Sequence, residues 1–186
     1  MKEIRIHGRG GQGAATAGEI LALAAFNEGK YAQSFPYFGP ERRGAPVVAF
    51  TRIDETPIRV RTDIHHPNCV VVLDPKLVRT INVVEGLMDG GIVVLNSVMD
   101  PSQISVRGKP SRIAAVDATA IALDTIGSPI TNMAMLGAFS AATGWVGIKA
   151  VREAIANRFS KELAEKNVKA AETAYEKTKI LELMVT

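Results

Sequence analysis

The stretch HGRGGQG, residues 7–13, is the feature that most restricts what this chain can fold into. It follows an alternating run, EIRI at residues 3–6, that predicts a strand, and it precedes a helical pattern at residues 14–27. Its glycines satisfy the spacing G-x-G-x-x-G, which permits positive φ and brings backbone N–H groups and a helix N-terminus close to an anion. A strand, a glycine turn and a helix in this order predict an α/β fold with a phosphate-binding turn.

Several roles compete for this turn. A dinucleotide site needs an acidic residue about 20 positions further on, at the end of the second strand, where this chain has Ser34-Phe35-Pro36. A P-loop needs a Lys followed by Ser or Thr after the glycines, and no such pair follows here. The glycines also suit close packing of a strand against a helix without any ligand. A stand-alone Rossmann-like nucleotide-binding protein therefore remains the alternative, with tightly bound NAD or FAD as its signature.

The rest of the chain alternates strand and helix patterns. Runs of β-branched residues without alternation, at residues 69–73, 91–95 and 113–116, predict parallel strands covered on both faces. From Asp117 onward the pattern is mostly helical. We therefore predict a single domain over residues 1–186: a three-layer α/β/α fold with a mixed, partly parallel sheet and a mostly helical C-terminal third.

Three further elements are expected in the first half of the chain. A second strand is predicted at residues 31–35. The runs at residues 46–53 and 57–61, separated by a short polar gap, predict an antiparallel hairpin. A helix is predicted over residues 75–87, because Pro75 suits the first helical position after Asp74 as a cap.

Composition limits the chemistry that the chain can hold. Apolar residues make up 47% of its 186 residues, which is typical of a folded globular protein. The only cysteine is Cys69, so the chain can form neither an internal disulfide nor a cysteine-ligated iron–sulfur or zinc site by itself. No apolar run approaches the roughly 20 residues that span a bilayer, and no signal-peptide pattern opens the sequence. We expect a cytoplasmic protein without a membrane segment.

Charge patterning argues against a nucleic-acid binder. The net charge is +3, and Lys and Glu interleave in the helical C-terminal part. The aromatic and basic stacking pattern of an RNA-binding platform is absent. One local exception is a basic patch that could meet a phosphate or an acidic protein surface. It comprises Arg42, Arg43, Arg52, Arg59 and Arg61.

Two motifs together carry a resemblance to a known family. GRGGQG at residues 8–13 and FPYFGPERRGAP at residues 35–46 are similar to the gamma subunit of 2-oxoacid:ferredoxin oxidoreductases, of which the pyruvate enzyme is the best known. The resemblance covers essentially the whole chain. It implies one non-catalytic subunit of a complex that converts a 2-oxoacid and coenzyme A to acyl-CoA, CO2 and reduced ferredoxin. It also implies alpha, beta and ferredoxin-like delta subunits, which hold thiamine diphosphate, Mg²⁺ and the [4Fe-4S] clusters.

The resemblance and the residues together suggest where this chain acts. The candidate contacts with cofactor phosphates, those of coenzyme A, or with a neighbouring subunit are Gly10, Gly11, Gln12 and Gly13, supported by Arg42 and Arg43. Arg42 and Arg43 also suit pairing with acidic residues of a partner subunit. The candidate interface residues are Tyr37, Phe38 and Glu41, because large aromatics in a loop rich in Pro and Gly commonly anchor an interface.

No residue of this chain is predicted to be catalytic or to bind a metal. His7 lies at the end of the first strand and suits a structural role better than that of a general base. His65 and His66 stand near Cys69, but zinc requires three or four converging ligands and no others have a useful spacing. The sequence alone does not distinguish pyruvate from a branched-chain 2-oxoacid or 2-oxoglutarate as the substrate.

Overall fold

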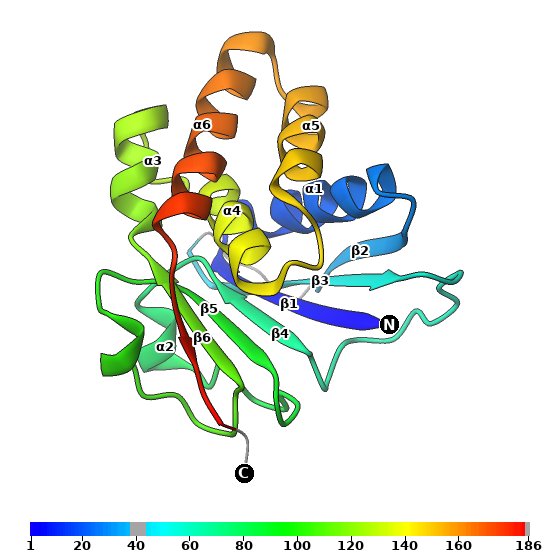
Figure 1. The fold of residues 1–186 in the computed structure, drawn as a ribbon, viewed down its shortest axis with the longest axis vertical. Helices are drawn as coiled ribbons and strands as arrows, with labels where there is room; N and C mark the ends of the chain where they lie inside the picture. Colours follow the sequence, from blue (N-terminus) through cyan, green and yellow to red (C-terminus); the bar gives the residue numbers. More distant parts are fainter. Residues whose placement is uncertain (38–43, 185–186) are drawn as a thin grey trace.

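A mixed β-sheet organises the chain, and helices cover it (Figure 1). The computed structural model describes residues 1–37 and 44–184, and within these ranges the sheet has seven strands. The strands are β1 (Lys2–Arg9), β2 (Tyr31–Tyr37), β3 (Pro46–Asp54), β4 (Cys69–Val72), β5 (Ile92–Asn96), β6 (Arg112–Val116) and β7 (Lys179–Glu182). The helices are α1 (Ala14–Asn27), α2 (Leu77–Thr80), α3 (Ala118–Ile126), α4 (Asn132–Thr143), α5 (Ile148–Arg158) and α6 (Lys161–Lys177), with a short 3-10 helix, η1 (Pro101–Gln103).

The strand order places the glycine turn near the middle of the sheet. The order is β2-β3-β1-β4-β5-β6-β7. Strands β1, β4, β5 and β6 are parallel neighbours, whereas β3 runs antiparallel to both β1 and β2, and β7 antiparallel to β6. The chain leaves β1 toward β2 and β3 on one side and later returns to form β4 on the other. In open α/β sheets, the carboxyl ends of strands at such a reversal form the usual ligand crevice.

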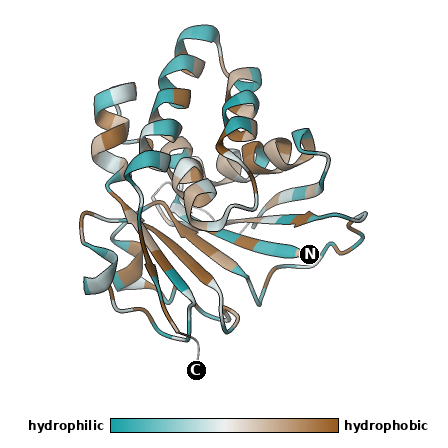
Figure 2. Cartoon of the chain, in the orientation of Figure 1, coloured by the Kyte–Doolittle hydropathy of each residue, from teal (hydrophilic) through white to brown (hydrophobic). Residues whose placement is uncertain are grey.

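Burial on both faces explains the unbroken apolar runs of the parallel strands. Consecutive residues of β4 point to opposite faces of the sheet: Val71 belongs to the larger hydrophobic cluster and Val70 to the smaller one. The larger cluster joins the sheet to the helices, and the smaller one includes Leu77 of α2. Figure 2 shows hydrophobic colour concentrated on β4, β5 and β6, while the outer turns of α5 and α6 are mostly hydrophilic.

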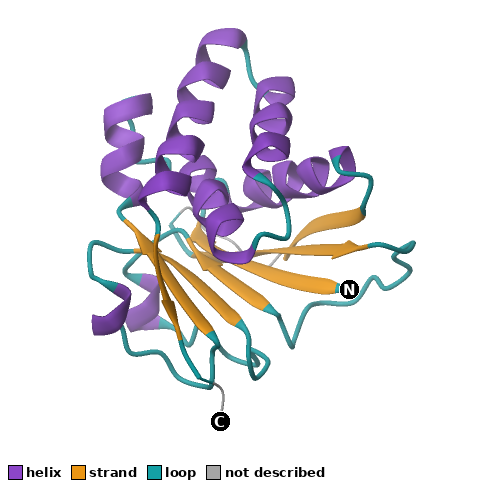
Figure 3. Ribbon diagram, viewed as in Figure 1, coloured by secondary structure: helices purple, strands orange, loops and turns teal. Residues whose placement is uncertain are grey.

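The layers confirm the predicted fold class. Helices α1 and α3–α6 cover one face of the sheet, and α2 lies on the opposite face with long connecting segments (Figure 3). The domain is therefore three-layered, with a mixed sheet and a mostly helical C-terminal third, although the layer that contains α2 is thin. None of the helices in the described ranges is long and apolar enough to cross a membrane.

The predicted hairpin between residues 46–53 and 57–61 is wrong. The first run forms β3, but residues 57–61 contain no strand. Strand β3 pairs with β1 along one edge and with β2 along the other, so no free edge remains for residues 57–61. The antiparallel partners of β3 are thus more distant in sequence than the short polar gap implied.

The helix predicted over residues 75–87 is also wrong in its extent. Only α2, four residues long, is helical there, and Ile81 returns to an extended conformation. Val83 and Val84 then pack in the smaller hydrophobic cluster beneath the sheet. Burying these valines on a nearly uncovered sheet face requires the chain to leave the helix early. The sequence analysis also missed β7, and β2 extends two residues beyond the predicted end.

Helix α4 is almost entirely buried in the helical layer, and a glycine allows it to pack closely against α6. Nearly all of its residues are buried, including Gly137. A Cβ atom on Gly137 would collide with the backbone oxygen of Ala171 in α6. Ala170 and Ala174 of α6 are fully buried as well. Small side chains on both helices therefore allow their backbones to approach closely.

Replacing Gly137 by Ala tests this close approach. In an ordinary helix interior the change from Gly to Ala stabilises by roughly 0.5–1 kcal/mol. Here we expect a loss of about 2 kcal/mol in the free energy of unfolding, because the new methyl group meets backbone that cannot rotate away. Gly18→Ala in α1 is the control, since its Cβ would meet the rotatable hydroxyls of Ser34 and Thr51. Denaturant unfolding that shows equal losses for both variants would contradict the interpretation.

Candidate functional site

The glycine turn joins the carboxyl end of β1 to the first residue of α1. Within it, the Gln12 N–H donates to the Arg9 carbonyl at 2.9 Å. Gly13 adopts a left-handed conformation (φ 75°) at the N-cap of α1, and no side chain caps the helix. The first turn of α1 also contains no acidic residue. Several backbone N–H groups at this end of α1 thus lack a side-chain acceptor, which favours an anion nearby.

Asp74 holds the turn from the neighbouring strand. Its Oδ2 accepts from Arg9 Nε at 2.9 Å and from Gln12 Nε2 at 3.1 Å. The other end of the Gln12 amide, Oε1, accepts from the Arg9 N–H at 2.8 Å. Both ends of Gln12 are therefore used to shape the turn. Asp74 follows β4 and is largely buried, so a protein carboxylate already balances the charge of Arg9 inside the turn.

Two glycines of the turn have different roles: Gly13 allows close packing, and Gly11 lies at an uncrowded position. A Cβ atom on Gly13 would collide with the side chain of Asn132 in α4, and Asn132 donates to the Gly13 carbonyl. Gly13 thus serves the close packing that the sequence left as one interpretation. Gly11 has a φ of +95°, and no atom of residues 1–37 or 44–184 lies within 4 Å of the position a Cβ would take. Gly11 is consequently the point where the turn is open to an external group.

The second sequence motif meets the glycine turn in space. The Gly10 N–H donates to the Ala45 carbonyl at 3.0 Å, and Arg9 Nη1 donates to the Gly44 carbonyl at 3.2 Å. On the other flank, Tyr37 is half exposed and packs edge-on against Phe50. The described flanks therefore bring residues 35–37 and 44–46 to the same end of the sheet as the turn. The remaining predicted contacts, Phe38, Glu41, Arg42 and Arg43, lie outside the described residues.

The sequence analysis missed a cleft that begins at Pro75, next to the Asp74 carboxylate that holds the turn. Its volume is about 730 Å³, and it lies at the carboxyl ends of β4, β5 and β6. Asn96 at the end of β5 fixes its inner wall: Nδ2 donates to the Leu73 carbonyl and Thr119 Oγ1, and Oδ1 accepts from Ala118 N–H. Val98, 82% exposed, contributes to an apolar side. Polar residues directly after parallel strands were the signal that could have identified this cleft.

The predicted basic patch is divided by the fold. Arg52 is fully buried, with Nε donating to Glu3 at 2.7 Å and Nη2 donating to the Thr62 carbonyl at 2.6 Å. It therefore ties β3 to its surroundings and is not available to an external anion. Arg59 and Arg61 remain exposed. The patch consequently does not form a continuous basic surface in the described part of the chain.

His7 is buried on the face of β1 that points away from the main helices. Arg5 Nε donates to His7 Nε2 at 3.1 Å, so the neutral imidazole carries its proton on Nδ1. Nδ1 is buried and has no hydrogen-bond partner among the described residues. Burial, together with the nearby charge of Arg5, lowers the pKa of His7 to about 3. A histidine that is neutral at physiological pH in this way suits a structural role.

The suggested metal ligands do not converge. Cys69 is completely buried in the larger hydrophobic cluster, and burial raises the pKa of its thiol far above its usual range. His65 instead lines a cleft on the sheet face that carries His7 and Arg5. Within residues 1–37 and 44–184, no group of three or more His, Cys, Asp or Glu side chains is arranged to hold a metal ion.

The buried neutral state of His7 predicts a pH dependence of stability. In the unfolded chain His7 has a pKa near 6.5 and binds a proton below it, whereas the folded chain leaves it neutral down to about pH 3. Its contribution is fully present above pH 6.5 and is lost as the pH falls. We expect a loss of roughly 2 kcal/mol between pH 7 and 5. Denaturant titrations should find that His7→Gln removes this difference, and an unchanged slope would contradict the assignment.

Comparisons with known proteins identify the family of the chain. Residues 3–177 match the family described as pyruvate ferredoxin/flavodoxin oxidoreductase. The pyruvate/ketoisovalerate oxidoreductases common subunit gamma of Thermococcus kodakarensis is 58% identical over 98% of this chain and 100% of its own length. The pyruvate synthase subunit PorC of Methanocaldococcus jannaschii is 54% identical over 94% of this chain and 96% of its own.

A solved structure gives the same result. The pyruvate oxidoreductase subunit PORC of Thermotoga maritima has a TM-score of 0.81 and 39% identity, with 97% of this chain and 98% of that chain covered. These matches extend over both motifs and the helical C-terminal part, and they do not favour the stand-alone Rossmann-like alternative. The chain belongs to the pyruvate ferredoxin/flavodoxin oxidoreductase family, and the relatives that it matches over nearly its full length are its gamma-type subunits.

Proposed function

We propose that this chain is the non-catalytic gamma subunit of a cytoplasmic 2-oxoacid:ferredoxin oxidoreductase that acts on pyruvate. The overall reaction converts pyruvate and coenzyme A to acetyl-CoA and CO2 and passes two electrons to ferredoxin. The observation that carries the proposal is the match to gamma and PorC subunits over nearly the whole chain, with both motifs included. The relatives' names mention pyruvate, and in one group also ketoisovalerate.

The catalytic cofactors belong, in this proposal, to the alpha, beta and delta subunits. Oxidative decarboxylation of a 2-oxoacid requires a thiamine carbanion and an electron relay, and such chemistry belongs to cofactors. A [4Fe-4S] cluster requires four thiolates, and this chain has a single cysteine, Cys69, which is buried among apolar side chains. This chain then contributes binding surface and orientation, while thiamine diphosphate, Mg²⁺ and the clusters lie in its partners.

The glycine turn is the part of this chain that we assign to the coenzyme A phosphates or to the adjoining subunit surface. Gly11 leaves the turn open, and the N-terminus of α1 has no capping side chain and no acidic residue. Gln12 acts indirectly by holding the backbone in place through Asp74. Arg42 and Arg43 belong to a segment whose described flanks contact the turn, so we retain them as candidate partners of the same phosphates.

The assignment as a non-catalytic subunit has a direct test. Purified alone, the chain should be folded, colourless, free of iron and thiamine diphosphate, and unable to reduce a viologen dye with any 2-oxoacid and coenzyme A. Addition of the other subunits should give dye reduction, with pyruvate, a branched-chain 2-oxoacid and 2-oxoglutarate tested separately. Turnover by this chain alone would overturn the assignment. Failure of the other subunits to bind the wild-type chain would overturn the proposed complex itself.

The role of the glycine turn is tested at Gly11, with Gly29 as a matched control. Both glycines have positive φ, +95° and +80°, and no described residue lies within 4 Å of where a Cβ would be. Ala at either position should therefore cost a similar amount, about 1 kcal/mol, in the free energy of unfolding. Only Gly11→Ala should raise the apparent KM for coenzyme A of the assembled enzyme, or prevent assembly, because Gly29 lies beyond the other end of α1. Equal kinetics for the two variants would favour a purely structural turn.

A further inference from the structure

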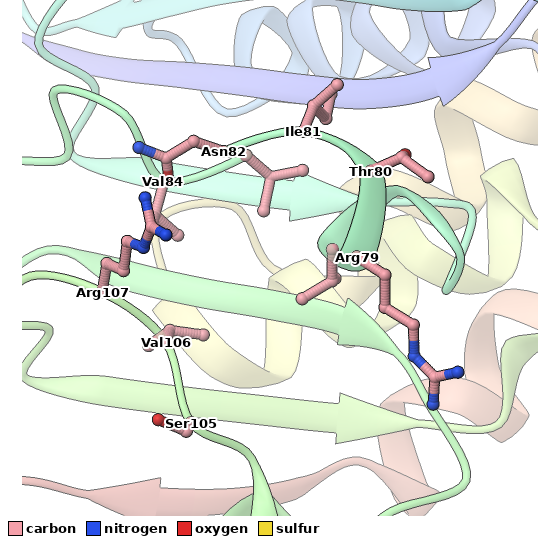
Figure 4. Close-up of a pocket in the computed structure, with 10 residues that line it drawn as sticks. Arg79, Thr80, Ile81, Asn82, Val84, Ser105, Val106 and Arg107 are labelled. Atoms are coloured by element: carbon pink, nitrogen blue, oxygen red, sulfur yellow. The ribbon is translucent and has the colours of Figure 1, made fainter.

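A groove lies on the sheet face opposite the main helices, between α2 and the segment before β6. Its volume is about 340 Å³, and it is lined by residues 78–84 and 105–107. Val83, Val84 and Val106 give it an apolar floor connected to the smaller hydrophobic cluster. Arg79 and Arg107 stand on its two sides, as Figure 4 shows. We call this feature the arginine groove.

The arginine groove contains positive charge that this chain does not neutralise. Arg79 and Arg107 are exposed, and their guanidinium groups make no hydrogen bond or ion pair with any residue in the described ranges. No carboxylate lines the groove. Of the acidic residues nearest in sequence, Asp74 pairs with Arg9 and Asp100 with Lys179. Glu85 and Asp117 line the two adjoining clefts and not the arginine groove. The groove therefore attracts an acidic group from outside the chain.

Some of the surface charge on the two sides of the sheet is paired and some is not. On the helical side, Arg152 pairs with Glu172 at 2.8 Å and Lys166 with Glu162 at 2.8 Å. Arg61, which makes no ion pair in the described ranges, lines a cleft that also contains Phe35, on the same sheet face as the arginine groove. Protein interfaces are enriched in Arg and depleted in Lys and Glu. Arg158 of α5 on the helical side is also exposed and makes no ion pair among the described residues, so Arg79 and Arg107 are distinguished by sharing one groove with an apolar floor.

The arrangement of the two guanidinium groups suits a chain segment better than a single phosphate. Figure 4 shows the guanidinium of Arg107 beside Asn82, whereas that of Arg79 points away from it on the other side of the groove. The groups do not converge on one point, and apolar side chains lie between them. Each planar guanidinium can bind one carboxylate with two parallel hydrogen bonds. Two carboxylates spaced along an extended chain, with an apolar residue between them, match this layout.

We infer that the arginine groove docks an acidic extended segment of another subunit of the complex. This inference rests on the proposed function and adds a second interface to it, on a different surface from the glycine turn. Docking here would place carboxylates against Arg79 and Arg107 and cover the apolar floor. Electrostatic complementarity of this kind fixes the register between partners and accelerates their association.

Charge reversal tests the groove in the reconstituted complex. The variant Arg79→Glu with Arg107→Glu should bind the remaining subunits at least tenfold more weakly than wild type, and its affinity should lose much of its salt dependence. The isolated variant should melt like the wild type, because both side chains are exposed and unpaired. The control is Lys161→Glu with Lys169→Glu, which makes the same charge change on α6 and should alter the affinity less than twofold.

The groove inference and the proposed function fail on different results. Equal affinity of the double Arg variant and wild type would overturn the groove inference while leaving the proposed complex intact. A wild-type chain that does not bind the other subunits would overturn the proposed function first. If millimolar pyrophosphate raises the melting temperature of the wild type but not of the double Arg variant, the groove binds a small anion, and the partner segment is rejected.

A chemical crosslink identifies the segment directly. The variant Arg79→Lys with Arg107→Lys keeps both charges and should retain most of the affinity. Its new amines can be joined to contacting carboxylates by a zero-length carbodiimide, and mass spectrometry can then identify the attached peptide. Crosslinks at Lys in these positions to an acidic stretch of one partner subunit support the inference. Crosslinks only within this chain, or none, overturn it.

Discussion

The carboxylate of Asp74 is the contact on which the geometry of the glycine turn depends. It follows β4 and accepts hydrogen bonds from side chains of the turn after β1. It therefore links the carboxyl ends of these two neighbouring parallel strands. With Arg9 Nε at 2.9 Å and Gln12 Nε2 at 3.1 Å, it also decides that Gln12 faces inward. Gly11, which this network leaves free, then becomes the part of the turn that can face a ligand or another chain.

The parts of the fold that the sequence predicted are those in which one local pattern decides the outcome. Strands β4, β5 and β6 are buried on both faces, and that burial requires the unbroken β-branched runs seen in the sequence. The failed hairpin and the short α2 depended instead on tertiary competition. Strand β3 already had partners on both edges, and Val83 and Val84 had to reach the sheet. No pattern within ten residues contains that information.

The candidate site shows the same division. The G-x-G-x-x-G spacing correctly predicted a turn between a strand and a helix, yet the separate tasks of Gly11 and Gly13 depend on what lies opposite each one. Asn132 crowds Gly13 from a helix 119 residues further along the chain. The charge of Arg52 likewise gave no sign of its burial against Glu3. Residue types predicted the kind of chemistry, and the fold determined which residues remain free for it.

The unequal covering of the two sheet faces connects stability with assembly. The helical face contains the larger hydrophobic cluster, and ion pairs lie on the outer surface of its helices. Among the described residues, the opposite face contains the smaller cluster, α2 and connecting segments, and the guanidinium groups of Arg79 and Arg107 have no partner there. On a protein that functions alone, such exposed charges serve mainly solubility. For a subunit they are useful, because an acidic partner neutralises them only when it is correctly placed.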